Sequence, residues 1–308
     1  MQEMQNGSKL MTASEAVKKF VPDGALVGLG GQNVGRCAMA VVHEIVRQQK
    51  KNLTICGCNL SINMDMLVGA GLVKRCEGGT GNLEYFGATF CFRRAIQDGV
   101  MEMEDYSHLA VISRLIAAEM GIPFMPTKSL LGSDMLVHQA ASTGKKFELM
   151  DNPWSVGDQV VVVPALSPDV AIIHVQKADE MGNAVIEGFL AHDVELVRAA
   201  KHTIVSCEEV VSTDEIRRDA ERTNIPYMYV SAVVEQPYGA HPTGAYRYYD
   251  YDADHVTQYQ KCARAGGEDY RNYLETYILN STDFYDYLDK VGGIKKMMSL
   301  VKNMKTML

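Results

Sequence analysis

The chain has 308 residues, of which 47% are hydrophobic, and a formal net charge of -8. This length is enough for one large α/β domain or two smaller ones. The negative charge argues against a nucleic-acid-binding protein, because such proteins usually carry a basic contact surface. No run reaches the roughly 18 apolar residues that a membrane-spanning helix needs. The N-terminus also lacks the apolar stretch of a signal peptide, so we expect a cytoplasmic protein that binds neither nucleic acid nor membrane.

The first predicted elements form a helix followed by a strand–turn–helix–strand unit. Thr12 and Glu15 have the spacing of a capping box at the start of a short helix. The apolar run 25–29 is typical of a buried strand. After a glycine-rich turn, the apolar positions 38, 41, 42, 45 and 46 follow helical spacing. Residues 53–58 predict the next strand, so this unit indicates a right-handed crossover and a parallel sheet.

The alternation of strands and helices continues along the chain. We expect helices over 85–97, 106–120, 193–200 and 213–218, and strands over 159–163, 169–175 and 203–207. The last forty residues look helical, with a break at Gly292-Gly293. Residues 123–144 and 237–254 are long irregular segments, which in compact domains are often functional. The chain is therefore predicted to be α/β throughout.

The seven cysteines give no sign of a disulfide framework or a metal site. Their number is odd and no CxxC pair occurs. Most lie within apolar runs, so we expect reduced, mostly buried thiols. They are Cys37, Cys56, Cys58, Cys76, Cys91, Cys207 and Cys262.

Glycines cluster where the first strand meets its helix, in the segment VGLGGQNVGRC (27–37). Such a turn lets backbone amides approach an anion near a helix N-terminus. The spacing does not match a dinucleotide-binding turn, because Asn33 stands where the third glycine would be. It is not a phosphate-binding P-loop either, since no Gly-Lys-Ser/Thr follows. The alternative is a tight turn with positive φ and no ligand, and both interpretations stay open.

No self-sufficient nucleophile is evident. There is no Gly-x-Ser-x-Gly elbow. Ser133 and His138 are five residues apart, but nothing in the sequence pairs them. Glu208 and Glu209 follow a predicted strand, where α/β sheets bind ligands. We prefer to interpret them as an acid pair at a helix start.

The remaining candidate side chains are one histidine and three arginines. His174 lies between two apolar residues, which favours a hydrogen-bonded core histidine over a catalytic one. Arg36 and the pair Arg93-Arg94 are candidate anion contacts; the alternative is that they are solvated arginines on helices. Composition and spacing alone do not name a reaction.

Sequence blocks along nearly the whole chain resemble one family, the A (alpha) subunits of family I CoA-transferases, and most closely the group that serves glutaconate CoA-transferases. The resemblance implies an α/β fold with a single open, mainly parallel sheet flanked by helices, and a C-terminal helical segment. It implies one domain of the alpha-subunit type over 8–308, and we expect residues 1–7 to be disordered. The blocks include VGLGGQN (27–33), DMLVGAGLVKR (65–75), FRRAIQDG (92–99), LGSD (131–134), PDVAIIHVQKADEMGNAVIEG (168–188), AAKHTIVSCEEVVSTDEIRRD (199–219) and YDYDAD (249–254).

The resemblance implies transfer of CoA from an acyl-CoA to a carboxylic acid. In such enzymes a glutamate attacks the thioester and the reaction follows a ping-pong course. In two-subunit members that glutamate belongs to the B (beta) subunit. This chain is therefore expected to carry no catalytic nucleophile, to be inactive alone and to assemble as an A2B2 heterotetramer. Coenzyme A is a cosubstrate, and no permanently bound metal, flavin or nicotinamide is implied.

By the same resemblance, the glycine turn lines the shared active site. Gly28, Gly30 and Gly31, with the amides of Gln32 and Asn33, would line the acyl site and act as an oxyanion hole. Gln32 stands where the family often has Phe, so this position is expected to tune acyl preference.

A second departure from the family concerns residues 82–84. Glutaconate-type enzymes carry small polar residues there, which suit the distal carboxylate of a dicarboxylic substrate. In the corresponding stretch here, Asn82-Leu83-Glu84, Leu83 adds bulk and Glu84 adds a negative charge. Two carboxylates repel by about 1 kcal/mol in water and by several times more at a partly buried site. We therefore expect that glutaconate is not the preferred substrate, unless Glu84 points away and pairs with Arg93 or Arg94.

Some heterodimeric relatives in steroid-ring breakdown instead hydrolyse a carbon–carbon bond in a cyclic CoA thioester. They lack the partner's nucleophilic glutamate. The segment PFMPTKSLLGSD (123–134), which contains the candidate substrate-binding Ser133, resembles that branch, as does Glu84. Lys128, a candidate anion contact, stands where that branch has Arg, and the two are not equivalent at a carboxylate site.

Two further expectations concern partners. The tyrosine-rich segment 238–254 either contacts another protein chain in part or packs on its own domain. A non-catalytic regulator on a related fold is disfavoured, because neither end carries a basic recognition helix.

Overall fold

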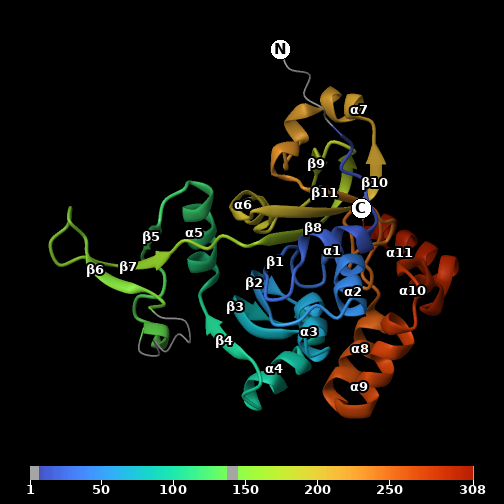
Figure 1. Cartoon of the computed structure of the whole chain (residues 1–308), viewed down its shortest axis with the longest axis horizontal. Helices are drawn as coiled ribbons and strands as arrows, with labels where there is room; N and C mark the ends of the chain where they lie inside the picture. Colours follow the sequence, from blue (N-terminus) through green and yellow to red (C-terminus); the bar gives the residue numbers. More distant parts are fainter. Residues whose placement is uncertain (1–6, 137–144, 308) are drawn as a thin grey trace.

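The fold is built on an eight-stranded sheet with the strand order β11-β10-β8-β1-β2-β3-β4, and β9 pairs with β8 (Figure 1). The computed structural model describes residues 7–136 and 145–307, so the disorder expected for residues 1–7 falls, apart from residue 7, outside them. Neighbouring strands are parallel except β9, which is antiparallel to β8. The strands are β1 (Leu26–Leu29), β2 (Leu53–Leu60), β3 (Val73–Gly81), β4 (Glu102–Asp105), β8 (Val170–Asp179), β9 (Ala184–Val185), β10 (His202–Val211) and β11 (Ala232–Glu235).

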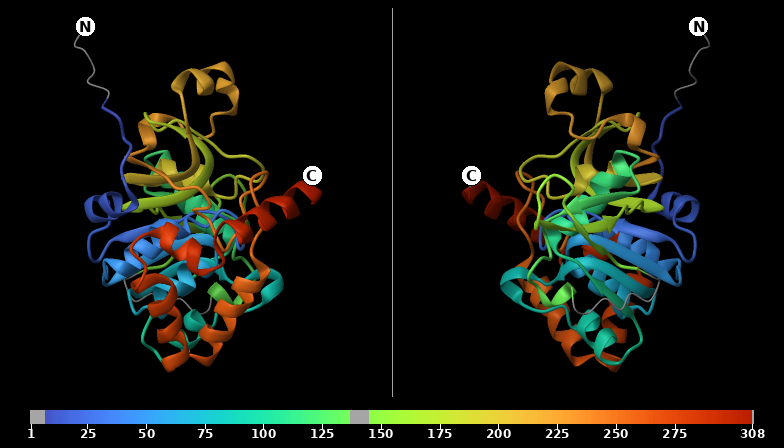
Figure 2. Two further views of the ribbon diagram at one scale, coloured as in Figure 1. Left: turned by 90° about the vertical axis from the view of Figure 1, so that its right-hand side faces the viewer. Right: turned by 90° about the vertical axis from the view of Figure 1, so that its left-hand side faces the viewer.

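Helices cover both faces of this sheet, and the C-terminal helices gather on one side of the body (Figure 2). The α-helices are α1 (Ala13–Phe20), α2 (Met39–Arg47), α3 (Ile62–Gly69), α4 (Phe90–Gln97), α5 (His108–Glu119), α6 (Asp193–Ala199), α7 (Thr213–Arg218), α8 (Ala253–Ala265), α9 (Gly267–Leu274), α10 (Phe284–Lys290) and α11 (Gly293–Met307). Short 3₁₀ turns are η1 (Glu84–Phe86), η2 (Asp134–Leu136), η3 (Ala220–Arg222) and η4 (Tyr227–Tyr229), and a π-turn, η5 (Glu275–Leu279), follows α9.

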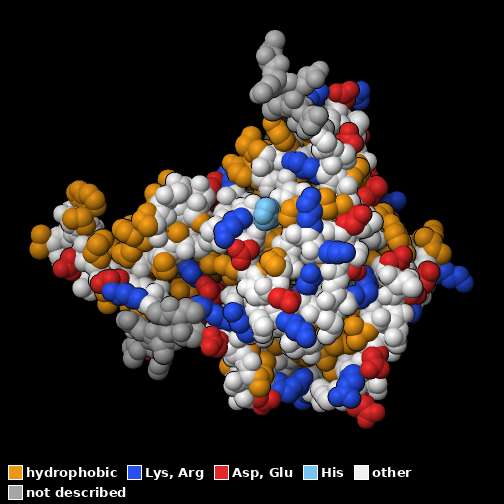
Figure 3. All heavy atoms as spheres, in the orientation of Figure 1, with side chains coloured by type: hydrophobic (Ala, Val, Ile, Leu, Met, Phe, Trp, Pro, Cys, Tyr) orange, Lys and Arg blue, Asp and Glu red, His pale blue; other side chains and the backbone are white. Residues whose placement is uncertain are grey.

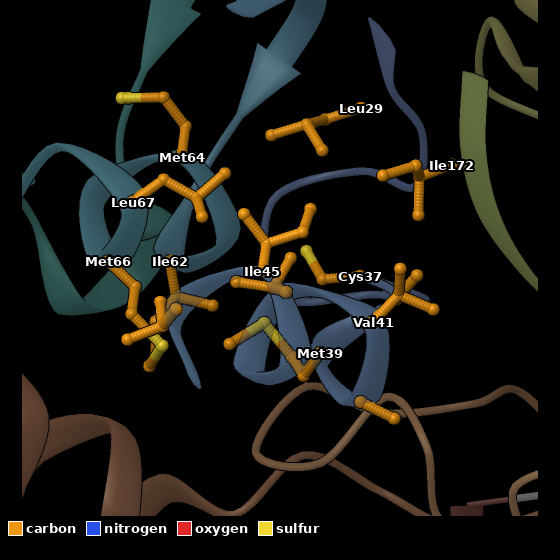
Figure 4. Packing of buried hydrophobic residues seen from close by; sticks show 14 of the residues in the cluster. Leu29, Cys37, Met39, Val41, Ile45, Ile62, Met64, Met66, Leu67 and Ile172 are labelled. Carbon is orange, nitrogen blue, oxygen red and sulfur yellow. The ribbon is translucent and has the colours of Figure 1, made fainter. Parts of the chain in front are cut away.

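Two buried hydrophobic clusters, one for each layer of helices, fill the space around the sheet. One contains residues of α1 to α4 and α8 to α11, and the other contains residues of α5 and α6. Figure 4 shows the first cluster, where Val41 and Ile45 of α2 lie near Leu29 of β1 and Ile172 of β8. The predicted α/β class, the mainly parallel sheet flanked by helices and the C-terminal helical segment are therefore confirmed.

The expectation of one sheet has to be corrected, because a second, antiparallel sheet is present. Its order is β5-β7-β6, and its strands are β5 (Phe124–Thr127), β6 (Glu148–Asp151) and β7 (Gln159–Pro164). Figure 1 shows it projecting from the body beyond α5. Part of 123–144, predicted to be irregular, is thus strand β5.

Strand β3 is not evident from the sequence, because its buried positions include charged residues. Arg75 and Glu77 are both buried in β3 and form an ion pair of 2.9 Å. Glu77 also accepts a hydrogen bond from Arg114 of α5 at 3.0 Å. Buried charges of this kind are tolerated because they are paired, and they hide a strand from a search for apolar runs.

The cysteines agree with the sequence analysis. All seven are free thiols, and six of them are buried. Within the described residues no three His, Cys, Asp or Glu side chains gather as metal ligands. No helix of the described chain is long and apolar enough to cross a bilayer.

Candidate active site

The glycine turn follows β1 and is a tight reversal of the backbone. Gln32 and Gly35 exchange two backbone hydrogen bonds, of 2.8 Å and 2.7 Å. Gly31 has φ 81°, and a Cβ atom there would come within 2.6 Å of the carbonyl oxygen of Arg36. Only glycine fits this position without strain. At Gly30 a Cβ would come within 2.7 Å of Asp193, so this glycine is needed for close packing.

The backbone N–H groups of the turn are already used within the chain. Gly30 donates to the carbonyl oxygen of Ile172 at 2.9 Å, and Gly31 donates to Oδ1 of Asp193 at 2.8 Å. The N–H of Gln32 is bonded to Gly35. The expectation that Gly30, Gly31 and Gln32 offer backbone amides to an oxyanion is therefore corrected. Gly28 lies inside β1, against Leu196.

Arg36 holds the turn in place instead of facing an anion. Its guanidinium is buried and forms a 2.6 Å ion pair with Asp193, the first residue of α6. It also donates to the carbonyl oxygens of His174 and Phe189, at 3.0 Å and 2.8 Å. These contacts correct two expectations, since Arg36 is neither an available anion contact nor a solvated helix arginine.

Asn33 and Glu84, two residues singled out in the sequence, are in direct contact. The side-chain amide of Asn33 donates to a carboxylate oxygen of Glu84. The backbone N–H of Glu84 donates in turn to Oδ1 of Asn82 at 2.9 Å. Asn33 and Glu84 both have positive φ, of 48° and 52°, and strained backbone of this kind often marks functional sites. Asn33, Asn82 and Glu84 thus form one polar group at the carboxyl ends of β1 and β3.

The polar group has the features expected of a ligand-facing surface. Asn33 is buried, and its Oδ1 has no hydrogen-bond partner among the described residues. Glu84 is exposed. It forms no ion pair with Arg93 or Arg94 in the described chain, and Arg94 donates instead to the carbonyl oxygen of Ala263. The alternative in which Glu84 points away to an arginine is therefore wrong.

Ser133 and Lys128 are not brought into this group. The hydroxyl of Ser133 donates to the carbonyl oxygen of Leu130 at 2.6 Å, and Lys128 forms an exposed 2.9 Å ion pair with Asp158. Lys128 and Ser133 both lie in the segment that follows β5, which is a strand of the second sheet. His138, considered as a partner for Ser133, lies outside the described residues.

Glu208 is a structural centre that the sequence analysis misinterpreted. It lies within β10, not at a helix start, and is buried. Its Oε1 accepts hydrogen bonds from Nε2 of His174 (2.7 Å) and the hydroxyl of Tyr249 (2.6 Å). Its Oε2 accepts from the backbone N–H of Tyr238 at 2.6 Å. His174 also contacts the Ser206 hydroxyl at 3.0 Å, so it is a hydrogen-bonded core histidine, as predicted.

This network fixes the tyrosine-rich segment behind the glycine turn. Gly244 accepts from the N–H of Arg36 at 2.8 Å and donates to the carbonyl oxygen of Val34 at 2.9 Å. Tyr249 is almost completely buried, and burial beside Glu208 raises the pKa of its hydroxyl well above the usual value. Tyr246 is exposed. Part of the segment therefore packs on its own chain, while its contact with another protein chain stays a prediction.

Comparisons with known proteins show the family to which this chain belongs. Residues 10–236 match the family model "Coenzyme A transferase". The chain is 38% identical to the alpha subunit of the glutaconate CoA-transferase of Acidaminococcus fermentans, over 94% of this chain and 93% of that protein. The crystal structure of that enzyme superposes with a TM-score of 0.90, covering 95% of each chain at 36% identity. The fold and the glycine turn therefore define a protein of the CoA-transferase type, and this chain belongs to the Coenzyme A transferase family.

Two further relatives are an uncharacterised protein and a subunit of a hydrolase. An uncharacterised protein of Archaeoglobus fulgidus is 40% identical over 95% of this chain, and the chain spans 64% of that protein's length. The IpdA subunit of a cholesterol ring-cleaving hydrolase from Rhodococcus jostii is 28% identical over 85% of this chain and 89% of its own.

Proposed function

We propose that this chain is the alpha subunit of a heteromeric CoA-transferase that moves CoA from an acyl-CoA to a carboxylic acid. The proposal is supported by the match to the corresponding chain of a glutaconate CoA-transferase over nearly the full length of both proteins. Coenzyme A is the cosubstrate, and no permanent cofactor is needed. The partner is a B (beta) subunit, in an A2B2 assembly.

In this proposal the nucleophile is a glutamate of the beta subunit. Its carboxylate attacks the thioester carbonyl, expels CoA thiolate and forms a mixed anhydride. The thiolate then attacks the glutamyl carbonyl, releases the first acid and leaves an enzyme–CoA thioester. The acceptor carboxylate completes the exchange by the same two steps in reverse. The state of this chain's own carboxylates supports the assignment: Asp193 is buried and bonded to Arg36 and Gly31, while Glu84 is bonded to Asn33.

The contact between Asn33 and Glu84 carries the proposal about the substrate. It holds an acceptor-only carboxylate beside the glycine turn, where the acyl group of the substrate would lie. A second carboxylate at the far end of the acyl chain would be repelled there. The preferred acid is therefore one whose distal end carries no negative charge, and glutaconate is disfavoured. Asn82 positions Glu84 through its backbone N–H, and Gln32 is the further candidate for acyl preference.

The carboxylate of Glu84 also supports a second candidate function. A chain that serves a CoA-thioester ring-opening hydrolase would have an acidic group at this place and no glutamate nucleophile on its partner. The Rhodococcus relative supports this alternative. In that case Lys128 and Ser133, which follow β5, are the next residues to examine.

One experiment separates the two reactions. The chain is expressed together with a candidate beta-type subunit from the same organism, incubated with an acyl-CoA, and reduced with sodium borohydride. Peptide mass spectrometry then locates the reduced residue. Reduction of a glutamate on the beta subunit, with none on this chain, is the outcome expected for the transferase. An unmodified pair that opens or hydrolyses the CoA ester would favour the hydrolase.

A further inference from the structure

The carboxylate of Glu84 is held in a fixed orientation. Leu83, which precedes η1, is fully buried, and Gln260 of α8 donates a hydrogen bond to the last residue of that turn. Asn82 accepts from the backbone N–H of Glu84 at 2.9 Å, and Asn33 donates to the carboxylate itself. A ligand that binds this carboxylate therefore does not have to order it first, which lowers the entropic cost of binding.

The pair of Asn33 and Glu84 has unused hydrogen-bond acceptors. A carboxylate only accepts, so the amide nitrogen of Asn33 has to face Glu84. The amide oxygen of Asn33 then lies on the other side of the group, and it has no donor among the described residues. Glu84 is exposed, and its carboxylate has room for further donors. What the pair lacks is therefore a hydrogen-bond donor.

Glu84 also lacks a counter-ion. On the face of the molecule that Figure 3 shows, acidic side chains lie among basic ones. In the described chain, however, no lysine or arginine forms an ion pair with Glu84. Arg36 pairs with Asp193, and Arg94 of α4 donates to the carbonyl oxygen of Ala263. A carboxylate without a partner becomes costly when a bound substrate displaces its water, and a positively charged substrate group removes that cost.

An exposed aromatic ring follows this carboxylate in the same turn. Tyr85 is 92% exposed. Its ring meets that of Phe86 edge-on at 5.7 Å, and Phe86 meets Tyr251 in the same way at 5.7 Å. The faces of aromatic rings attract alkylammonium groups. Glu84 and Tyr85 therefore present, on neighbouring residues, the two kinds of group that recognise an organic cation.

We infer that the acyl site takes acids whose distal end carries an ammonium group, as in an unbranched ω-amino acid. The inference rests on the proposed function, in which the acyl chain lies beside the glycine turn. The ammonium donates a charge-assisted hydrogen bond to Glu84 and supplies the counter-ion that this chain does not. An alkyl end would provide neither the donor nor the charge, and a hydroxyl end would provide only the donor.

Kinetics with matched acids test the inference in the complete enzyme. β-Alanine, 4-aminobutyrate and 5-aminopentanoate are compared with butyrate, pentanoate and hexanoate, in which a methyl group replaces the ammonium. The series also finds the length of acid that reaches Glu84. At that length we expect kcat/KM for the amino acid to exceed that of its alkyl counterpart by about tenfold or more. The hydroxy acid of the same length separates hydrogen bonding from charge, and we expect its value to lie between the two.

Three variants locate the source of this preference. Glu84→Gln keeps an acceptor for Asn33 and removes the charge, so the preference for the amino acid is expected to disappear. Tyr85→Leu is expected to lower it by about twofold to fivefold. Glu268→Gln is the matched control, because Glu268 is exposed on α9 and the substitution removes the same charge. A wild-type enzyme that prefers the alkyl acid at every length, or a preference that Glu84→Gln retains, would overturn the inference.

Binding without transfer keeps this inference separate from the proposed function. Saturation-transfer NMR of the purified complex, with no acyl-CoA present, compares the same acids. We expect the amino acids to bind more tightly than the alkyl acids, and to lose this advantage in Glu84→Gln. A complex that binds them in this way, but transfers CoA to none of the acids or to acetate, would contradict the proposed transfer and support the ammonium site. Equal binding to wild type and Glu84→Gln would contradict the ammonium site even where transfer is observed.

Discussion

The side-chain amide of Asn33 donates a hydrogen bond to the carboxylate of Glu84, which joins the glycine turn to the 3₁₀ turn η1 that follows β3. The two residues are separated by 51 positions in the sequence. Because Glu84 is exposed and negatively charged, this contact defines the electrostatic character of the candidate site.

Replacing Glu84 is expected to change the choice of acid. With Glu84→Ser in the complete enzyme, the rate with glutaconate should rise by about fivefold or more, since a repulsion of about 1 kcal/mol or more is removed. The measurement is kcat/KM for glutaconate and for a monocarboxylic acid of equal length. Glu84→Gln is the control that keeps an acceptor for Asn33 and removes the charge. If neither variant gains activity with glutaconate while the fold is intact, the selectivity assigned to Glu84 is wrong.

Breaking the Arg36–Asp193 ion pair is expected to destabilise the chain. Arg36→Met leaves Asp193 as a buried carboxylate without its charged partner, and such changes cost about 3–5 kcal/mol. Urea unfolding measures the free energy of unfolding. Arg217→Met, at an exposed 3.6 Å pair with Asp214, serves as the control and should lie within about 1 kcal/mol of wild type. A loss in Arg36→Met no larger than in the control would contradict the role given to this pair.

The Glu208 network gives a graded prediction. Tyr249→Phe removes one of three hydrogen bonds to the buried carboxylate and is expected to cost about 1–2 kcal/mol. Glu208→Gln weakens all three hydrogen bonds and places an amide N–H against other donor groups. We therefore expect it to lower the free energy of unfolding by more, about 2–4 kcal/mol. Denaturant unfolding of both variants measures which of them loses more free energy of unfolding. Equal losses, or a larger loss in Tyr249→Phe, would show that Glu208 is not the centre of the network.

Asp65 is expected to make stability depend on pH. Burial raises the pKa of this carboxyl to about 6, although it accepts hydrogen bonds from the Phe92 N–H and the Tyr259 hydroxyl. The folded chain therefore holds this proton to higher pH than the unfolded chain. Its contribution to stability is present at low pH and is lost as pH rises to about 6, with a total near 3 kcal/mol.

The variant Asp65→Asn removes that titration and keeps both hydrogen bonds possible. Its free energy of unfolding relative to wild type is expected to grow by about 2 kcal/mol between pH 4.5 and pH 8. Thermal or urea unfolding at the two pH values measures the change. A difference that is the same at both pH values would contradict the prediction.

The sequence predicted the first βαβ unit and the fold class because the signals there are local. Apolar periodicity marks α2, and an apolar run marks β1. By contrast, β3 was hidden by the buried ion pair of Arg75 and Glu77. In the second sheet, β7 was predicted as the strand over 159–163, but β5 and β6 were missed, since both are short, β5 contains Pro126 and much of their apolar surface faces solvent.

The site was predicted only in part. Asn33, Asn82 and Glu84 come together, as their assignment to one site implied. The sequence does not reveal that the Gly31 N–H is already bonded to Asp193, because that partner is 162 residues away. Nor does it reveal that β10 continues through Glu208, since strand pairing and the donors from His174 and Tyr249 make this acid a core residue.

Two residues that are distant in the sequence, Asp193 and Gly244, hold the glycine turn in place through hydrogen bonds. During synthesis, residues 28–36 leave the ribosome long before either anchor exists. Contacts so distant in sequence form late in folding, because a long loop has to close first. A nascent chain that ends before residue 193 therefore contains every glycine of the turn, but it lacks the contacts that fix the conformation of the turn. The glycine turn and the neighbouring Asn33 and Glu84 therefore reach their final geometry only after most of the protein has been made.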